Sequence, residues 1–169
     1  MDIVVNDTNI LIDLYESGLL DVCRNMKLEF HTLDMIMQEI ENEKQQAGVR
    51  QLIDSGCLKV KSLSGEQLIL VIEKIDEYNG VCNLSPEDIS VMVYAKEHGY
   101  RLLTGDKTLR EKASLENIQV SGILYLTDMM INDNLISPLQ MAEALGKMLQ
   151  SNKRLPRKLI LERIEKYRK

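Results

Sequence analysis

The stretch Ile3-Val4-Val5-Asn6-Asp7-Thr8-Asn9-Ile10-Leu11-Ile12 predicts a strand, a turn and a helix in direct succession. Residues 3–5 are β-branched and apolar, which favours a buried strand. Residues 6–9 are all types that commonly cap helices, and the apolar helical pattern behind them runs to Tyr15 and stops at Gly18. Asp7 is therefore expected where a buried strand ends and a helix begins.

Short strand patterns continue to alternate with longer helical patterns along the rest of the chain. This alternation is typical of a parallel sheet with helices on both faces, an α/β fold. No internal repeat or long linker divides the chain, so we expect one domain over residues 1–169, with a core of about 1–130 and a C-terminal helical extension of about 131–169. Further strands are predicted at residues 28–31, 58–63, 100–104 and 118–120, and helices at 34–44, 66–78, 86–98, 106–113, 123–132, 138–150 and 155–167.

The charge of the chain is unevenly distributed. The formal net charge is −5, but residues 153–169 hold eight Lys or Arg and two Glu. That segment therefore carries +6, which leaves −11 on residues 1–152. The basic segment could bind phosphate or a partner, or it could be an ordinary solvated terminal helix; the sequence leaves both interpretations open.

Composition excludes several other classes of protein. Three cysteines with no close pair indicate neither a disulfide framework nor a zinc site. The N-terminus lacks the pattern of a secretory signal, and no apolar run approaches the ~20 residues that span a bilayer. We therefore expect a cytoplasmic protein without a membrane partner. One Phe and no Trp argue against a base-stacking platform for single strands.

Three acids are expected to meet at one edge of the sheet. Asp7 follows the first strand, and Asp106 follows the strand at residues 100–104. Asp88 lies in the first turn of the helix at residues 86–98, which leads into that strand. Because parallel strands all point the same way, these three positions lie at the carboxyl edge, where such folds bind ligands.

Glu39 is a fourth candidate, because it interrupts the apolar stretch of Met35, Ile36 and Ile40 in the predicted helix at residues 34–44. Clustered carboxylates repel one another, and a divalent cation relieves that repulsion. Mg²⁺ and Mn²⁺ prefer such oxygen ligands and can activate a water for phosphodiester cleavage.

Each of these acids, taken singly, also has an ordinary structural interpretation. Asp7 and Asp106 could be helix N-caps, and Asp88 could belong to a capping arrangement that begins at Ser85. Glu39 could simply face the solvent.

Four segments, in order along the chain, resemble the motifs of the PIN-domain family. They are residues 3–12, with a strand, Asp, Thr and an apolar helix; residues 35–40, with a helical Glu; residues 84–100, where an Asp opens a helix that ends in Gly; and residues 102–110, with a post-strand Asp, a basic residue and Leu-Arg. Residues 120–124, 134–138 and 153–156 also resemble the VapC-like toxins of toxin–antitoxin pairs.

The resemblance implies a three-layer α/β/α fold with a central parallel sheet of four to five short strands. It implies an endoribonuclease that requires Mg²⁺ or Mn²⁺, acts on RNA, forms homodimers and is neutralised by a cognate antitoxin protein.

The family's functional residues carry over by position. Asp7, Glu39, Asp88 and Asp106 match the four catalytic, metal-binding acids, and Thr8 and Asn9 match the polar residues beside the first acid. Gly105 departs from the Asp or Asn that the family often has there, which puts an auxiliary ligand in doubt. Lys107 and Arg110 are candidate phosphate contacts, with a plain role on the helix surface as the alternative.

Two other functions remain as alternatives. One is a catalytically silent PIN-like module that binds RNA or a protein partner. The other is a phosphatase of the haloacid-dehalogenase type with Asp7 as nucleophile. That class needs a second Asp at position 9, which is Asn9 here, and no Gly-rich phosphate loop is present.

Overall fold

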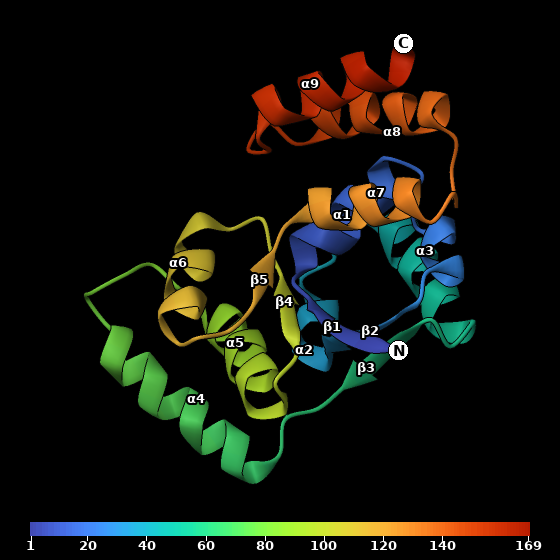
Figure 1. Ribbon diagram of the computed structural model, residues 1–169. Coiled ribbons are helices and arrows are strands. Elements are labelled where there is room, and N and C mark those ends of the chain that lie inside the picture. The colour runs from blue at the N-terminus through green and yellow to red at the C-terminus, as the bar shows by residue number, and fades with distance from the viewer.

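A computed structural model describes all residues from 1 to 169 and has a five-stranded parallel sheet at its centre (Figure 1). The spatial order is β3-β2-β1-β4-β5, and every neighbouring pair is parallel. The strands are β1 (Asp2–Asn6), β2 (Leu28–Leu33), β3 (Leu58–Lys61), β4 (Arg101–Leu103) and β5 (Val120–Ser121). The predicted three-layer α/β fold with four to five parallel strands is confirmed.

Nine α-helices and one short 3₁₀ helix connect and cover the strands. They are α1 (Thr8–Glu16), the 3₁₀ helix η1 (Asp21–Asn25), α2 (Asp34–Gln38), α3 (Glu43–Asp54), α4 (Gly65–Tyr78), α5 (Pro86–His98), α6 (Lys107–Leu115), α7 (Ile123–Asn132), α8 (Pro138–Ser151) and α9 (Arg157–Arg168).

The central strand β1 separates two hydrophobic clusters. Successive side chains of a strand point to opposite faces, so Val4 packs with α1, α3, α7 and α8, and Val5 packs with α5 and α6. On the neighbouring strand β4, Leu103 belongs to the same cluster as Val4, and Leu102 belongs to the same cluster as Val5. Burial on both faces explains why these strands read as continuous apolar runs.

The C-terminal helices α8 and α9 form a hairpin that packs on α1 and α7 and forms the upper lobe in Figure 1. Leu145 and Ile160 are fully buried in the same cluster as α1. Arg163 of α9 also binds Asp128 of α7 through two hydrogen bonds, of 2.8 and 2.7 Å. None of the helices is long and apolar enough to cross a membrane.

The helix predicted at residues 34–44 is wrong in its extent. Helix α2 ends at Gln38, with Glu39 as its C-cap, and a new helix starts at Glu43. Asn42 produces this second start, because its side chain accepts hydrogen bonds from the amides of Lys44 and Gln45 at 3.0 and 3.1 Å. The last strand lies at Val120–Ser121 rather than 118–120, where it pairs with β4.

Candidate active site

Asp7 is held rigidly at the carboxyl edge of the sheet. Its backbone amide donates to the carbonyl of Leu103 on β4 at 3.0 Å, and its side chain is only 4% exposed. Oδ1 accepts the amide of Thr8 at 2.7 Å, so Asp7 caps α1. Oδ2 accepts the hydroxyl of Thr104 at 2.9 Å. The side chain therefore has a fixed orientation.

Asp106 lies across the end of β4 and is tied to Asp7 through Thr104. The Asp106 amide donates to Oγ1 of Thr104 at 3.1 Å, while the same hydroxyl donates to Asp7. Oδ1 of Asp106 caps α6 by accepting the amide of Leu109 at 2.8 Å. Oδ2 of Asp106 makes no hydrogen bond, so one oxygen of this carboxylate is free to bind a ligand.

Asp88 belongs to the capping box that the sequence suggested. Its Oδ2 accepts the amide of Ser85 at 3.0 Å, and its own amide donates to Oγ of Ser85 at 3.1 Å. The capping interpretations of Asp7, Asp88 and Asp106 are thus confirmed. They do not exclude a second role, because Oδ1 of Asp88, like Oδ2 of Asp106, has no hydrogen-bond partner.

The pKa values indicate that these acids share one electrostatic environment. The pKa of Asp7 is raised to about 6, chiefly by burial and then by the negative charges of Asp88 and Asp106, while the Thr104 hydrogen bond acts in the lowering direction. The pKa of Asp88 is raised, mainly by burial and then by the charges of Asp106 and Glu87. The charges of Asp88 and Asp106 therefore act on Asp7, and the charge of Asp106 acts on Asp88.

Glu39 lies at the exposed rim of this group. It is the C-cap of the short helix α2, not a residue within a longer helix as the sequence suggested. Partial desolvation raises its pKa, and the charges of Asp7 and Glu87 follow as the next causes. The negative charge of the buried Asp7 therefore acts on Glu39, whose side chain remains accessible to solvent.

The residues around Asp7 fit a hydrated divalent cation better than an enclosed one. No group of three or more His, Cys, Asp or Glu side chains is close enough to surround a metal ion. Mg²⁺, however, commonly binds one or two carboxylates and keeps several waters. Both side-chain polar atoms of Asn6 and Oγ1 of Thr8 are buried beside Asp7 without partners. Such unpaired groups are suited to waters around an ion.

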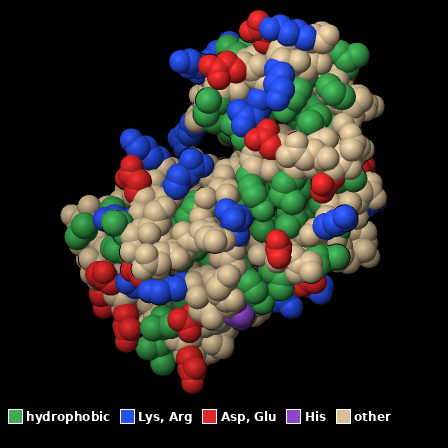
Figure 2. Space-filling view, viewed as in Figure 1, with side chains coloured by type: hydrophobic (Ala, Val, Ile, Leu, Met, Phe, Trp, Pro, Cys, Tyr) green, Lys and Arg blue, Asp and Glu red, His purple; other side chains and the backbone are tan.

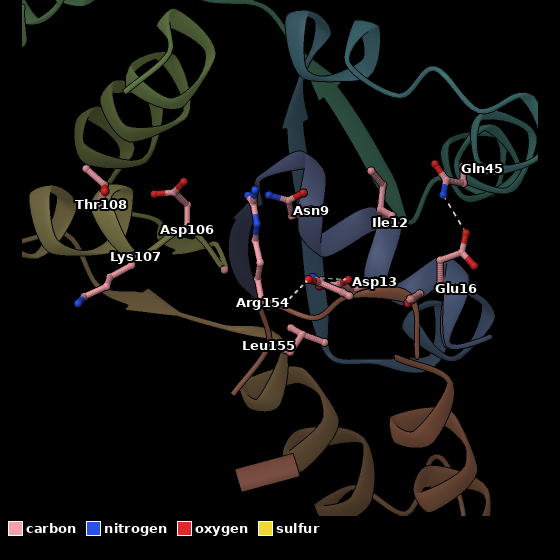
Figure 3. Close-up of a pocket in the computed structure, with 13 residues that line it drawn as sticks. Asn9, Ile12, Asp13, Glu16, Gln45, Asp106, Lys107, Thr108, Arg154 and Leu155 are labelled. Atoms are coloured by element: carbon pink, nitrogen blue, oxygen red, sulfur yellow. Dashed lines mark hydrogen bonds between the residues drawn. The ribbon is translucent and has the colours of Figure 1, made fainter. Parts of the chain in front are cut away.

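A cavity of about 710 Å³ opens beside Asp106 (Figure 3). Asn9 and Lys107, two of the residues suggested by the sequence, contribute to its wall. Arg110 does not, because its guanidinium donates to the carbonyl of Thr104 at 3.1 Å, which is a structural role. Thr8 is buried at 5% exposure and also lies outside the cavity wall.

Sequence reasoning missed three residues of this region. Thr104 links Asp7 to Asp106, and its only sequence signal was a polar residue at the end of a buried strand. The others are Asp13 on α1 and Asn152 at the end of α8, which line the same cavity as Arg154 of the basic segment at residues 153–169. Asp13 interrupts the apolar stretch of α1, which is a weak but usable signal in the sequence.

Two solved structures are similar to this fold. VapBC2 from Rickettsia felis, bound to a DNA fragment from its promoter, superposes with a TM-score of 0.51 at 14% identity, over 71% of this chain and 98% of that chain. PAE2754 from Pyrobaculum aerophilum superposes with a TM-score of 0.52 at 19% identity, over 74% of this chain and 93% of that chain. At such identities the likeness shows the fold alone.

Sequence comparison identifies the family. The chain is 33% identical over 97 residues to Endoribonuclease Nob1 of Methanocaldococcus jannaschii, an alignment that covers 57% of this chain and 47% of that protein. The matched region is therefore about half of that relative. A family described as PIN domain matches residues 3–169. Because that match spans nearly the whole chain, the protein belongs to the PIN-domain family.

Proposed function

We propose that this protein is a divalent-metal-dependent endoribonuclease. The observation that carries the proposal is the state of Asp7, a buried carboxylate at the ligand-binding edge of the sheet. Its pKa is raised to about 6 by burial and by the neighbouring Asp88 and Asp106. A cation that binds these oxygens would offset both the burial and the repulsion. The similarity to an endoribonuclease supports RNA as the substrate.

Each side chain of the site has a proposed role that follows from its position. Asp7, with Asp88 or Asp106, would hold a hydrated Mg²⁺ or Mn²⁺. Thr104 would fix the Asp7 carboxylate, and Asn9 lies in the wall of the cavity beside Asp106. A bound ion would supply charge stabilisation and would help to activate a water for attack. Glu39 is exposed with a raised pKa, which suits an oxygen that accepts a proton from the attacking water.

In the cell, we propose that the protein acts in the cytoplasm as a homodimeric toxin that a cognate antitoxin neutralises. The resemblance of residues 120–124, 134–138 and 153–156 to VapC-like toxins motivates this proposal, and the fold shared with VapBC2 is compatible with it. Induced expression should arrest growth, and co-expression of a small protein encoded next to its gene should restore it. Normal growth under induction with active enzyme would contradict the toxin role and leave the nuclease activity in place.

A catalytically silent module that binds RNA or a protein is the second candidate. This candidate is favoured by the finding that no three acidic side chains lie close enough together to enclose a metal ion. The two candidates differ in whether a divalent cation binds.

The test is the double variant Asp7→Asn/Asp106→Asn. Asn caps helices about as well as Asp, so the variant should keep its fold. It should lose Mn²⁺-dependent cleavage of a labelled single-stranded RNA. Asp76→Asn, on the exposed surface of α4, is the matched control and should cleave normally. Undiminished cleavage by the double variant would overturn the proposal.

A further inference from the structure

We propose that Arg154 binds an RNA phosphate in the cavity beside Asp106 and that Asp13 and Asn152 position it there. This inference rests on the proposed ribonuclease function and adds to it a substrate-binding element from the C-terminal hairpin. Arg154 lies in the connection between α8 and α9. That connection borders the cavity of about 710 Å³ whose wall also contains Asp106.

The side chain of Arg154 extends into the region between Asp106 and Asp13, with its guanidinium toward Asn9 (Figure 3). It also borders a second cavity of about 300 Å³, which reaches Gly122 and the start of α9. Lys107 and Gly105 are common to both cavity walls. Arg154 therefore lies where the cavity beside Asp106 meets the second cavity, which follows the start of α9.

The backbone of Arg154 is fixed by a chain of hydrogen bonds. Nδ2 of Asn152 donates to both carboxylate oxygens of Asp13, at 3.0 and 3.3 Å. Oδ1 of the same Asn152 accepts the backbone amide of Arg154 at 3.0 Å. Leu155, the next residue, is buried in the main hydrophobic cluster. The connection is thus tied to α1 immediately before Arg154 and to the core immediately after it.

Asp13 is an unusual residue for its surroundings. Its side chain is 3% exposed, and burial raises its pKa to about 6, with Asn152 acting in the opposite direction. A buried carboxylate with one amide partner contributes little to stability by itself. What it does provide is a directional acceptor that orients Asn152 and, through it, the start of the segment carrying Arg154.

The guanidinium of Arg154 has no protein partner, although acids lie in the same cavity wall. It forms none of the salt bridges in the structure. Arg154 is the only basic residue of 153–169 that lines the cavity beside Asp106. Arg163, by contrast, is bound to Asp128. Of the basic segment at residues 153–169, only Arg154 therefore lies in this cavity wall.

An anion with several oxygens is the ligand that fits this arrangement. Arg presents a planar set of donors that matches phosphate, and Lys107 offers a second cation whose only pairing is a 3.9 Å contact with exposed Glu111. Figure 2 shows Lys and Arg side chains along the hollow between the C-terminal lobe and the body. A phosphodiester in this hollow would lie beside Asp106, which is the one of the four candidate metal-site acids in the cavity wall.

The experiment measures Mn²⁺-dependent cleavage of a single-stranded RNA oligonucleotide by Arg154→Ala. We expect KM to rise about tenfold with kcat within twofold, because binding and not the chemical step is altered. The slope of log KM against log salt should become shallower by about 0.7, the value for one phosphate contact on a single strand. Arg157→Ala, exposed on α9 and outside both cavities, is the matched control and should change neither.

The positioning role is tested at Asp13. Asp13→Asn keeps an acceptor for Asn152 and should leave KM near its original value. Asp13→Ala removes that acceptor and should raise KM several-fold. Combined with Arg154→Ala it should add no further increase, because both changes act through one residue. Fully additive effects would overturn the positioning role.

The outcomes separate this inference from the proposed function. If the unaltered protein cleaves RNA and Arg154→Ala shows the same KM and salt slope, the inference is wrong and the ribonuclease stands; Arg154 would then be a candidate contact for a protein partner. If the unaltered protein neither binds nor cleaves RNA, the proposed function fails, and this inference fails with it.

Discussion

The hydroxyl of Thr104 donates a hydrogen bond of 2.9 Å to Oδ2 of Asp7, although 97 residues separate the two in the chain. The same hydroxyl accepts the amide of Asp106 at 3.1 Å. One buried side chain thereby sets the position of two candidate metal ligands just beyond the ends of the neighbouring parallel strands β1 and β4. The hydrogen bond from Thr104 lowers the pKa of Asp7, whereas burial raises that pKa by a larger amount.

Replacing Thr104 with Ala should therefore impair the site. Asp7 would lose a hydrogen bond to its charged form, so its pKa should rise. The acid limb of the pH–rate profile for RNA cleavage should move to higher pH, and unfolding free energy should fall by about 1–3 kcal/mol. Thr104→Ser keeps the hydroxyl and should retain the original profile. Equal profiles for Ala and Ser would show that the hydrogen bond has no part in tuning Asp7.

Asp13 should make stability depend on pH in a defined direction. Its pKa rises from 3.8 to about 6 on folding, so the folded state binds the proton more tightly than the unfolded state. Its contribution to stability is thus greatest below pH 3.8 and is lost as the pH rises through 6. Asp13→Asn should stabilise the protein by roughly 2 kcal/mol at pH 8 and not at pH 4.

Urea unfolding of the metal-free protein at the two pH values measures this difference. Asp76→Asn, exposed on α4, controls for the general loss of a negative charge and should shift both curves little. A gain for Asp13→Asn that is the same at pH 4 and pH 8 would contradict the assigned titration.

Glu39→Gln should separate activity from stability. The side chain is exposed at the end of α2, so its loss of charge should change unfolding free energy by no more than about 0.5 kcal/mol. If Glu39 accepts a proton during cleavage, kcat should fall about 100-fold or more with little change in KM. Glu41→Gln, two residues further on and also exposed, should cleave normally. Full activity of Glu39→Gln would remove it from the site.

The sheet and its acidic edge followed from local patterns. The β-branched run before Asp7 and the capping residues after it identified a strand end, and the same reasoning located Asp106 and Asp88. Because parallel strands share one direction, local identification was enough to place all three at one edge. The family match over residues 3–169 then confirmed the family that the motifs resemble.

The rest depended on contacts between distant segments, which no local pattern encodes. Thr104 meets Asp7 across 97 residues, and Asn152 meets Asp13 across 139. Helix α3 was missed because only Val49 and Leu52 of its residues are buried, so its apolar periodicity is weak. The break after Gln38 moved Glu39 to a helix end, since Asn42 starts a new helix. That residues 1–169 form a single domain stays a prediction.

Calorimetric titration of Mn²⁺ into the metal-free protein at pH 8 tests the central claim most directly, which is that Asp7 and its neighbours bind a divalent cation. We predict saturable binding to the unaltered protein and to Asp76→Asn, and loss of that binding in Asp7→Asn/Asp106→Asn. Ligand linkage also predicts that Mn²⁺ raises the unfolding midpoint only of the proteins that bind it. No saturable binding to the unaltered protein, or equal binding to the double variant, would contradict the account.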